Sequence, residues 1–256
     1  MTESRPVLSR PAEGVAVIEL NRPAAANRLQ PEDLATLVEH LDVLERDPDV
    51  RALVLTANGP NFCAGFDLRA LLAGLKSGER VGQGDTAFEA LADRLEATRL
   101  ITIVAIHGAV VGGATDLALA CDLRLGTSAV RFQMPAASFG LPLYAGALQR
   151  YVSRLGIDHA KRLVFLAEKI DSDELLRIGF LHERVDESAL RARALALAST
   201  VAALPAKPLA AMKQVLNAAA LGQGTAAAQR DALAAAFDAD AIVERIAALR
   251  RWGREA

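Results

Sequence analysis

Two glycine-bearing stretches of the sequence could supply backbone donors to a reacting oxygen. Residues 61–68 (NFCAGFDL) and residues 106–117 (IHGAVVGGATDL) each come directly after a short apolar run. Glycine permits a sharp turn or a close backbone approach, and a helix start presents unpaired N–H groups at the positive end of its dipole. Two such turns that face one point would form a two-donor pocket for an oxyanion. The alternative for each stretch alone is an ordinary turn between a strand and a helix.

Other chemistry is not indicated by the residue types. Neither glycine stretch is a GxGxxG fingerprint or a Walker loop, so a nucleotide cofactor is not predicted. Cys63 and Cys121 cannot form a disulfide framework or a four-thiolate site, and their apolar neighbours favour reduced core thiols of a cytoplasmic protein. His40, His159 and His182 show no metal-ligand spacing, so we expect no metal.

Short apolar runs predict the strands that would position the two turns. Val15–Leu20, residues 52–56 and Ile101–Ile106 are nearly continuous, β-branched and flanked by breakers. These features favour strands that are buried on both faces. Weaker strands are predicted at residues 121–127, 129–133 and 181–185.

Helical patterns alternate with these strands. Pro31–Arg46 has leucines at helical spacing, proline and two acids in its first turn, and Pro48 just beyond its end. Phe88, Leu91 and Leu95 mark a second helix before the strand at residue 101. The alternation predicts a layered α/β core over residues 1–186. Residues 76–85, with three glycines and mixed charges, are predicted to form a mobile loop.

The composition changes after residue 186. Alanine dominates residues 187–256, and Pro205 and Pro208 bracket a break between two helical stretches. We interpret this part as a helical C-terminal region that packs on the core or on another subunit.

Length and charge exclude several classes of protein. The chain has 256 residues, 52% hydrophobic and 23% charged, so a disordered or collagen-like protein is excluded. A net charge of −2 and 4% aromatic residues argue against nucleic-acid binding. No apolar run approaches 18 residues and no secretory signal begins the sequence, so we expect no membrane contact and a cytoplasmic location.

Four stretches, taken in order, resemble the enoyl-CoA hydratase/isomerase (crotonase) superfamily: Asn21-Arg22-Pro23, FCAGFDL, IHGAVVGGATDLALACDLRL and FGLPLYAGALQRYVSRLG. The similarity runs from about Val15 to Val185 and continues more loosely to the last helix. It implies a spiral of ββα turns followed by a helical C-terminal region, assembled as a homotrimer or a dimer of trimers. The implied substrate is an acyl-CoA thioester, with coenzyme A as part of the substrate and no separate cofactor. The combination is specific to the superfamily and not to one reaction.

The resemblance also implies site residues. The backbone N–H groups of Phe66 and Gly113 would hold the thioester oxygen, and loss of one such donor typically costs about 3–4 kcal/mol of barrier. Coenzyme A would lie along the backbone of Ala24, Ala25, Ala26 and Ala64, flanked by Phe66, Asp67, Leu68 and Arg69. Ala24 stands where the family often has a lysine, which puts one phosphate contact in doubt. Arg250 and Arg251 could reach a phosphate of coenzyme A, or they could be a solvated helix end.

The sequence departs from the two glutamates of family hydratases. Asp116 stands at the first position, one helical turn beyond Gly113 and on the same face, with a side chain one methylene shorter. It could move a proton or merely cap its helix. Ala136 stands at the second position and provides no acid or base.

The next polar group in this region is Tyr144. Some family isomerases and a dehalogenase have their working aspartate at about this position, and a decarboxylase branch has a tyrosine about one residue earlier. Tyr144 could therefore donate a proton, or it could be a core or rim tyrosine, since its ordinary pKa near 10 makes it a poor base at neutral pH. His107 is interpreted as structural, because histidine or asparagine is common there in the family.

Two functional hypotheses remain open. The first is an acyl-CoA enzyme that stabilises a thioester enolate and carries out isomerisation, decarboxylation or a narrow-specificity hydration, with Asp116 or Tyr144 moving the proton. The second, motivated by Ala136, is a non-catalytic acyl-CoA-binding or assembly subunit.

Overall fold

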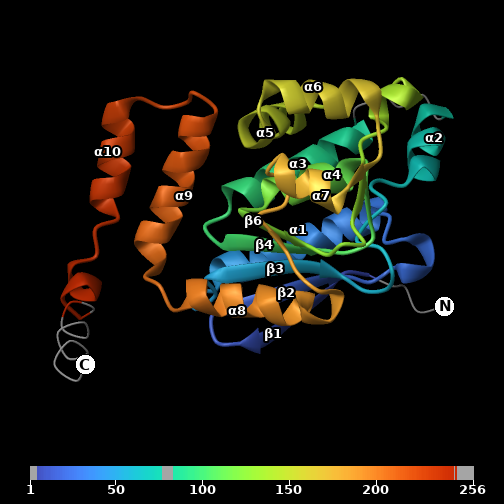
Figure 1. Ribbon diagram of the computed structural model, residues 1–256. Helices are drawn as coiled ribbons and strands as arrows, with labels where there is room; N and C mark the ends of the chain where they lie inside the picture. Colours follow the sequence, from blue (N-terminus) through green and yellow to red (C-terminus); the bar gives the residue numbers. More distant parts are fainter. Residues whose placement is uncertain (1–4, 77–82, 245, 247–256) are drawn as a thin grey trace.

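Two sheets form the framework of the computed structural model, which describes residues 5–76, 83–244 and 246 (Figure 1). The larger sheet has the strand order β1-β2-β3-β4-β6-β9. Its strands are β1 (Val7–Ala12), β2 (Val15–Leu20), β3 (Ala52–Ala57), β4 (Ile101–Ile106), β6 (Leu123–Gly126) and β9 (Glu183–Arg184). The smaller sheet contains β5 (Ala109–Val111), β7 (Arg131–Gln133) and β8 (Ile170–Asp171). β1 pairs antiparallel with β2, and the rest of the larger sheet is parallel.

Helices surround the sheets. They are α1 (Pro31–Arg46), α2 (Leu68–Lys76), α3 (Gln83–Ala97), α4 (Gly113–Ala120), α5 (Ala145–Leu155), α6 (Ile157–Leu166), α7 (Ser172–Arg177), α8 (Leu190–Ala202), α9 (Ala206–Ala220) and α10 (Ala226–Ala235). Three short 3₁₀ turns, η1 (Pro23–Ala25), η2 (Ala136–Phe139) and η3 (Glu187–Ala189), lie between these elements, and residues 239–244 are also helical.

The chain passes repeatedly from the larger sheet to the smaller one and then into a helix. β4–β5–α4 and β6–β7–α5 follow this path. After β3, Cys63 forms a single parallel bridge with Val110 of β5 before the chain enters α2, so the first unit repeats the path in reduced form. The predicted α/β spiral of ββα turns with a helical C-terminal region is confirmed.

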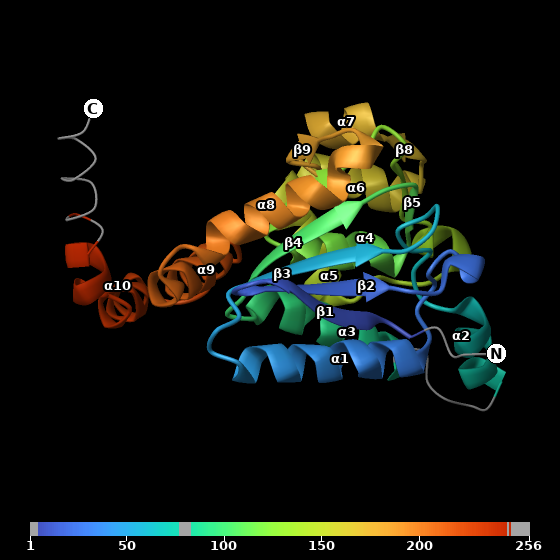
Figure 2. The same ribbon diagram turned by 90° about the horizontal axis from the view of Figure 1, so that it is seen from below.

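Helices cover both faces of the larger sheet. Figure 2 shows α8 along one face, with α1 and α3 on the opposite side. Leu190, Ala194, Ala198 and Ala202 recur every fourth residue of α8 and form its buried stripe. They pack against strand residues that include Val54 and Ile103. Because most of this stripe is alanine, the helix can lie close to the strands.

α9 and α10 stand away from the body in both views (Figures 1 and 2). We call the described residues from 206 onward the C-terminal arm. Lys213 of α9 is buried and bonds Asp122 Oδ2 and the carbonyl oxygen of Leu100, both at 2.8 Å, which attaches α9 to the core. Leu216, Phe237 and Val243 are each at least 68% exposed, so the arm presents a largely apolar surface.

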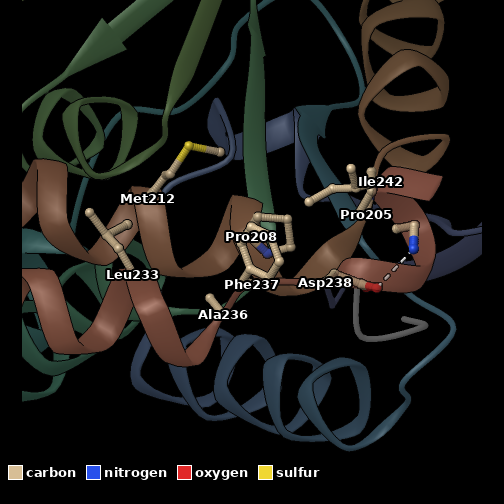
Figure 3. Close-up of a pocket in the computed structure, with 9 residues that line it drawn as sticks. Pro205, Pro208, Met212, Leu233, Ala236, Phe237, Asp238 and Ile242 are labelled. Atoms are coloured by element: carbon tan, nitrogen blue, oxygen red, sulfur yellow. Dashed lines mark hydrogen bonds between the residues drawn. The ribbon is translucent and has the colours of Figure 1, made fainter. Parts of the chain in front are cut away.

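A cavity of about 280 Å³ lies between α9, α10 and the turn that follows α10 (Figure 3). Its walls are almost entirely apolar, with Pro205, Pro208, Met212, Leu233, Phe237 and Ile242 among the lining residues. Beside this cavity, Asp238 accepts a hydrogen bond from the Ala241 N–H at 3.0 Å.

The strands predicted from the sequence are present in the structure. The weaker strands predicted at residues 121–127, 129–133 and 181–185 contain β6, β7 and β9. The strands at residues 15–20 and 101–106 and the helix at residues 31–46 are confirmed with the same bounds. β1, β5 and β8 were not predicted. The predicted mobile loop at residues 76–85 falls mostly on residues 77–82, which lie outside the described residues. The division at residue 186 stays a prediction, and α8, which follows it, packs on the sheet.

Among the described residues no single helix is long and apolar enough to cross a bilayer. The segments Glu187–Ala202 and Ala206–Ala220 meet the criteria of length and composition only as a pair, and this pair is bent by 109°.

Candidate active site

The first glycine turn is held between two neighbouring segments. On one side Ala64 N–H donates to the carbonyl oxygen of Ala26 at 2.9 Å, and Leu29 N–H donates to that of Gly65 at 2.8 Å. On the other side Cys63 exchanges backbone hydrogen bonds with Ala109 and Val111 around β5, at 3.1 and 3.0 Å. Backbone bonds on both edges leave this segment little freedom.

The two glycine turns lie in direct contact. Gly65 has a φ of +84°, and a Cβ at this position would lie 2.7 Å from the carbonyl oxygen of Val111 and 3.1 Å from the nitrogen of Gly113. A side chain would therefore push the turns apart, so glycine is required here. Phe66 follows Gly65, and Gly113 follows Gly112. These two residues thus come from segments that touch.

The second turn bends sharply into a helix. Gly112 has a φ of +59°, and its N–H donates to the carbonyl oxygen of Gln133 at 2.9 Å, after which α4 begins at Gly113. The ring of Phe88 from α3 packs on Gly113, where a Cβ would lie 2.6 Å from Phe88 Cζ.

Phe66 and Gly113 both present unused backbone donors. Within the described part of the chain, neither N–H group donates a hydrogen bond to a protein atom. Both residues line the same cavity. Two unpaired N–H groups at one cavity, one of them at a helix start, are suited to an acceptor that carries negative charge.

This cavity has a volume of about 480 Å³ and is mostly apolar. Its lining residues are Ala64, Phe66, Leu68, Leu71, Phe88, Val111, Gly112, Gly113, Gln133, Met134, Pro135, Ala136, Ser138, Phe139, Leu141, Pro142, Leu143 and Tyr144. Among these described residues Tyr144 has the only ionisable side chain, and no carboxylate, imidazole or amine faces the space.

Tyr144 connects the cavity to a buried carboxylate. Its hydroxyl donates to Asp116 Oδ2 at 2.5 Å. Burial, followed by the negative charge of Asp116 and this hydrogen bond, raises the pKa of Tyr144 far above its ordinary value. Tyr144 is therefore a neutral phenol at any physiological pH. Asp116 is only 1% exposed and does not line the cavity.

Arg150 of α5 holds Asp116 from the other side. Its Nε donates to Oδ1 and its Nη2 to Oδ2, each at 2.8 Å. Burial alone would lower the pKa of Arg150, but its hydrogen bonds and the charge of Asp116 raise it. Arg150 is not among the site residues predicted from the sequence. The available signal was its place in α5, where Ala147, Arg150, Tyr151 and Leu155 share the buried side at helical spacing.

The residues predicted to hold coenzyme A are only partly brought together. The Ala26–Ala64 hydrogen bond joins the two predicted segments, and Ala64 and Leu68 line the cavity. Ala24 and Ala25 lie in η1 and do not line it.

Asp67 and Arg69 do not form a pair of free ligands for coenzyme A, because the side chain of Asp67 is already held by neighbouring residues. Asp67 is buried, accepts from Arg69 N–H at 2.9 Å and pairs with Arg28 at 2.9 Å. Burial alone would raise the pKa of Asp67, but these contacts and a hydrogen bond from Gln30 lower it. The side chain of Asp67 thus stabilises the start of α2, while Arg69 is exposed there. Arg250 and Arg251 lie outside the described residues.

Histidine and cysteine have local partners near the site. His107 Nε2 lies 2.7 Å from the carbonyl oxygen of Gly59, a contact that joins the second glycine stretch to the segment just before the first. Burial raises the pKa of the Cys63 and Cys121 thiols to about 12. In the described ranges no group of three His, Cys, Asp or Glu side chains converges on one point.

Fold and cavity together define a protein built as a spiral of ββα turns, with an apolar site where two glycine turns meet. Its sequence matches the model of the enoyl-CoA hydratase/isomerase family over residues 10–245. The short-chain-enoyl-CoA hydratase of Clostridium acetobutylicum is 32% identical over 206 residues, which are 79% of this chain and 77% of that protein. The mitochondrial enoyl-CoA hydratase domain-containing protein 2 of Mus musculus is 34% identical, covering 79% of this chain and 69% of that protein.

Solved structures agree. DspI of Pseudomonas aeruginosa superposes with a TM-score of 0.87 at 30% identity, covering 98% of this chain and 95% of that one. An enoyl-CoA hydratase from Polaromonas sp. JS666 gives a TM-score of 0.86 at 26% identity, covering 96% of each chain. This chain belongs to the enoyl-CoA hydratase/isomerase family, whose members act on acyl-CoA thioesters.

Proposed function

We propose that this protein decarboxylates a 2-carboxyacyl-CoA thioester, holding the enolate oxygen with the N–H groups of Phe66 and Gly113 and protonating the α-carbon from Tyr144. The observation that carries the proposal is the lining of the cavity, where Tyr144 is the only ionisable side chain among the described residues. Hydration and double-bond isomerisation both require a base that takes a proton from water or from carbon. The described residues of the cavity wall offer no such base, since Ala136 is apolar and Asp116 lies behind Tyr144.

Decarboxylation needs no base, because the electrons come from a carbon–carbon bond. The bond between the α-carbon and the carboxylate breaks, carbon dioxide leaves, and the electron pair moves to the thioester oxygen. Backbone donors aimed at that oxygen stabilise the charge as it forms. The apolar wall solvates the substrate carboxylate poorly, which favours a step that removes it.

The second step is protonation of the enolate. The α-carbon of a thioester enolate is a much stronger base than a phenolate, so a phenol with a raised pKa can still protonate it. The proton moves from Tyr144 to the α-carbon, and water then returns a proton to the tyrosinate. The charge of Asp116 disfavours the tyrosinate and so promotes this return. The substrate brings its own coenzyme A, and these steps use no further cofactor.

The test is turnover of a panel of 2-carboxyacyl-, 2-enoyl- and 3-enoyl-CoA thioesters. We expect release of carbon dioxide from a 2-carboxyacyl-CoA and, in D₂O, a product with one deuterium at the α-carbon. Tyr144→Phe is expected to lower kcat by about 10²–10⁴-fold, the usual contribution of a general acid. Tyr151→Phe is the matched control, because its hydroxyl bonds Thr115 Oγ1 at 2.6 Å and does not line the cavity.

Other outcomes would replace the proposal. Full activity of Tyr144→Phe would remove the role of Tyr144. Turnover of enoyl-CoA alone would favour hydration or isomerisation, and hydration is the second candidate because relatives such as that of Clostridium acetobutylicum are named hydratases. Tight acyl-CoA binding by calorimetry without any product would favour the non-catalytic subunit.

We further propose that the coenzyme A moiety lies along residues 24–26 and 64, and that the protein assembles as a homotrimer or a dimer of trimers. The Ala64–Ala26 hydrogen bond supports the first statement, because it joins both segments at the cavity. The exposed apolar side chains of the C-terminal arm support the second statement, since patches of this kind mark protein–protein contacts; Phe237, which also lines the cavity in Figure 3, is one of them.

A further inference from the structure

We infer that Arg150 is a positioning residue of this site: it fixes the carboxylate of Asp116 and, through it, the direction of the Tyr144 hydroxyl. The inference deepens the proposed function, and its activity measurement rests on that function. Arg150 does not line the cavity, and besides its bonds to Asp116 it interacts with the Tyr144 hydroxyl.

Both carboxylate oxygens of Asp116 have hydrogen-bond donors. Both oxygens accept from the guanidinium of Arg150 at 2.8 Å, and Oδ2 also accepts from Tyr144 at 2.5 Å. The planar guanidinium fork matches a carboxylate in two parallel hydrogen bonds and so fixes its plane as well as its position. Tyr144 therefore finds its acceptor at one place and in one orientation.

Arg150 is itself held from a second helix. Its Nη1 donates to Asp93 Oδ1 at 2.7 Å and to Glu96 Oε2 at 3.1 Å, both in α3. The other oxygen of Glu96 accepts from Arg154 at 2.6 Å. The guanidinium is thus held between carboxylates of α4 and α3, and it is 1% exposed.

The backbone of α5 leaves room for this arrangement. A Cβ at Gly146 would lie 2.7 Å from Asp93 Oδ1 and 3.2 Å from Arg150 Nη2. The carboxylate of Asp116 on α4 is surrounded by charged and titratable groups of two other elements. These are Asp93 and Glu96 on α3, and Tyr144, Arg150, Tyr151 and Arg154 from α5 and its N-cap.

Loss of Arg150 would leave Asp116 as an uncompensated buried charge, which is strongly unfavourable. The carboxylate would then be free to turn, and the hydroxyl of Tyr144 would lose its fixed acceptor. Because small misplacements at a reacting centre lower rates by up to about 10²-fold, kcat should fall while binding of the thioester is retained.

The experiment compares Arg150→Lys and Arg150→Met with Arg154→Met. Arg154 is the matched control, because it lies one turn later on α5 and shares Glu96 but does not contact Asp116. Kinetics give kcat and KM separately. Fluorotyrosine labelling gives two ¹⁹F resonances, since the sequence has two tyrosines, and Tyr151→Phe assigns that of Tyr144.

We expect Arg150→Met to lower kcat about 10²-fold with little change in KM, and to shift and broaden the Tyr144 resonance. Arg150→Lys should restore part of both, and Arg154→Met should change neither. In an Asp116→Asn background, Arg150→Met should cause a much smaller further shift, because Arg150 acts mainly through Asp116 and only in part directly on the Tyr144 hydroxyl. This double variant removes both charges and keeps the test usable if Arg150→Met alone does not fold.

An unchanged Tyr144 resonance in Arg150→Met, equal effects of Arg150→Met and Arg154→Met, or a full additional shift in the Asp116→Asn background would each overturn the inference. The resonances are measured without substrate. If the wild-type protein turns over no thioester, the proposed function fails while the resonances still decide the role of Arg150.

Discussion

Phe88 and Gly113 meet at the start of α4, and this contact leaves no space for a side chain at residue 113. A Cβ there would approach three ring atoms of Phe88 at 2.6–3.0 Å. The N–H group that we propose as an oxyanion donor is therefore aimed by the packing of an aromatic ring from another helix.

We predict that Gly113→Ala lowers kcat by about 10²–10³-fold, because the displaced helix start misdirects one donor. The overpacked contact should also reduce the free energy of unfolding by about 1–3 kcal/mol. Steady-state kinetics and urea denaturation measure the two effects. Phe88→Leu in the same chain provides space for the new methyl group and should recover part of the lost stability. Wild-type kcat in Gly113→Ala would contradict the role of this N–H group.

At the scale of elements, Arg124 and His182 join β6 to the segment that leads into β9. Arg124 is buried, and its backbone N–H lies 3.1 Å from His182 Nδ1. Its Nη2 lies 2.9 Å from Nε2 of the same ring. Both ring nitrogens thus face donors, so the neutral ring fits this place better than the charged one. Desolvation, followed by the charge of Arg124, lowers the pKa of His182 from 6.5 to about 4.

This pKa predicts how stability depends on pH. The unfolded chain binds a proton at His182 below pH 6.5, whereas the folded chain does so only below about pH 4. The contribution of this group is therefore complete above pH 6.5 and is lost as the pH falls towards 4. We expect the free energy of unfolding, measured with urea across this range, to fall more in the wild-type protein than in His182→Gln. Parallel curves for the two proteins would show that His182 does not contribute.

The sequence predicts long elements better than short ones. The apolar runs at residues 15–20 and 101–106 show their type because burial on both faces selects continuous β-branched residues. β5 has only three residues and therefore no readable period, and it is stabilised by pairing with Cys63 and β7.

The candidate site, too, can be predicted from the sequence only in part. The motifs point to Phe66, Gly113, Asp116 and Tyr144, and the structure brings Phe66, Gly113 and Tyr144 to one cavity. The sequence motifs do not distinguish a carboxylate that faces substrate from one that is buried in an ion pair. That distinction depends on Arg150, which is 34 residues from Asp116 in the chain and on another helix.

At the scale of the whole molecule, the C-terminal arm leaves apolar side chains exposed at a distance from the core. Phe237 lines the cavity of the arm and is still 70% exposed. An apolar surface of this kind is stable in water when a second copy of the chain covers it.

We predict that Phe237→Glu lowers the mass of the assembly measured by analytical ultracentrifugation, because the contact would bury an unpaired charge. Val43→Glu is the matched control, since Val43 is an exposed apolar residue of α1 in the body. A monomeric wild-type protein, or equal masses for all three proteins, would contradict assembly through the arm.

The free N–H groups beside the two glycine turns belong to the main chain, which every residue type except proline also carries. Mutational drift can therefore exchange the side chains at positions 116, 136 and 144 without deleting these donors. An ancestral scaffold of this kind can acquire new chemistry by a few substitutions around an unchanged backbone. The same property makes this chain a favourable starting point for directed evolution, with a carboxylate introduced at residue 136 as the first substitution to try.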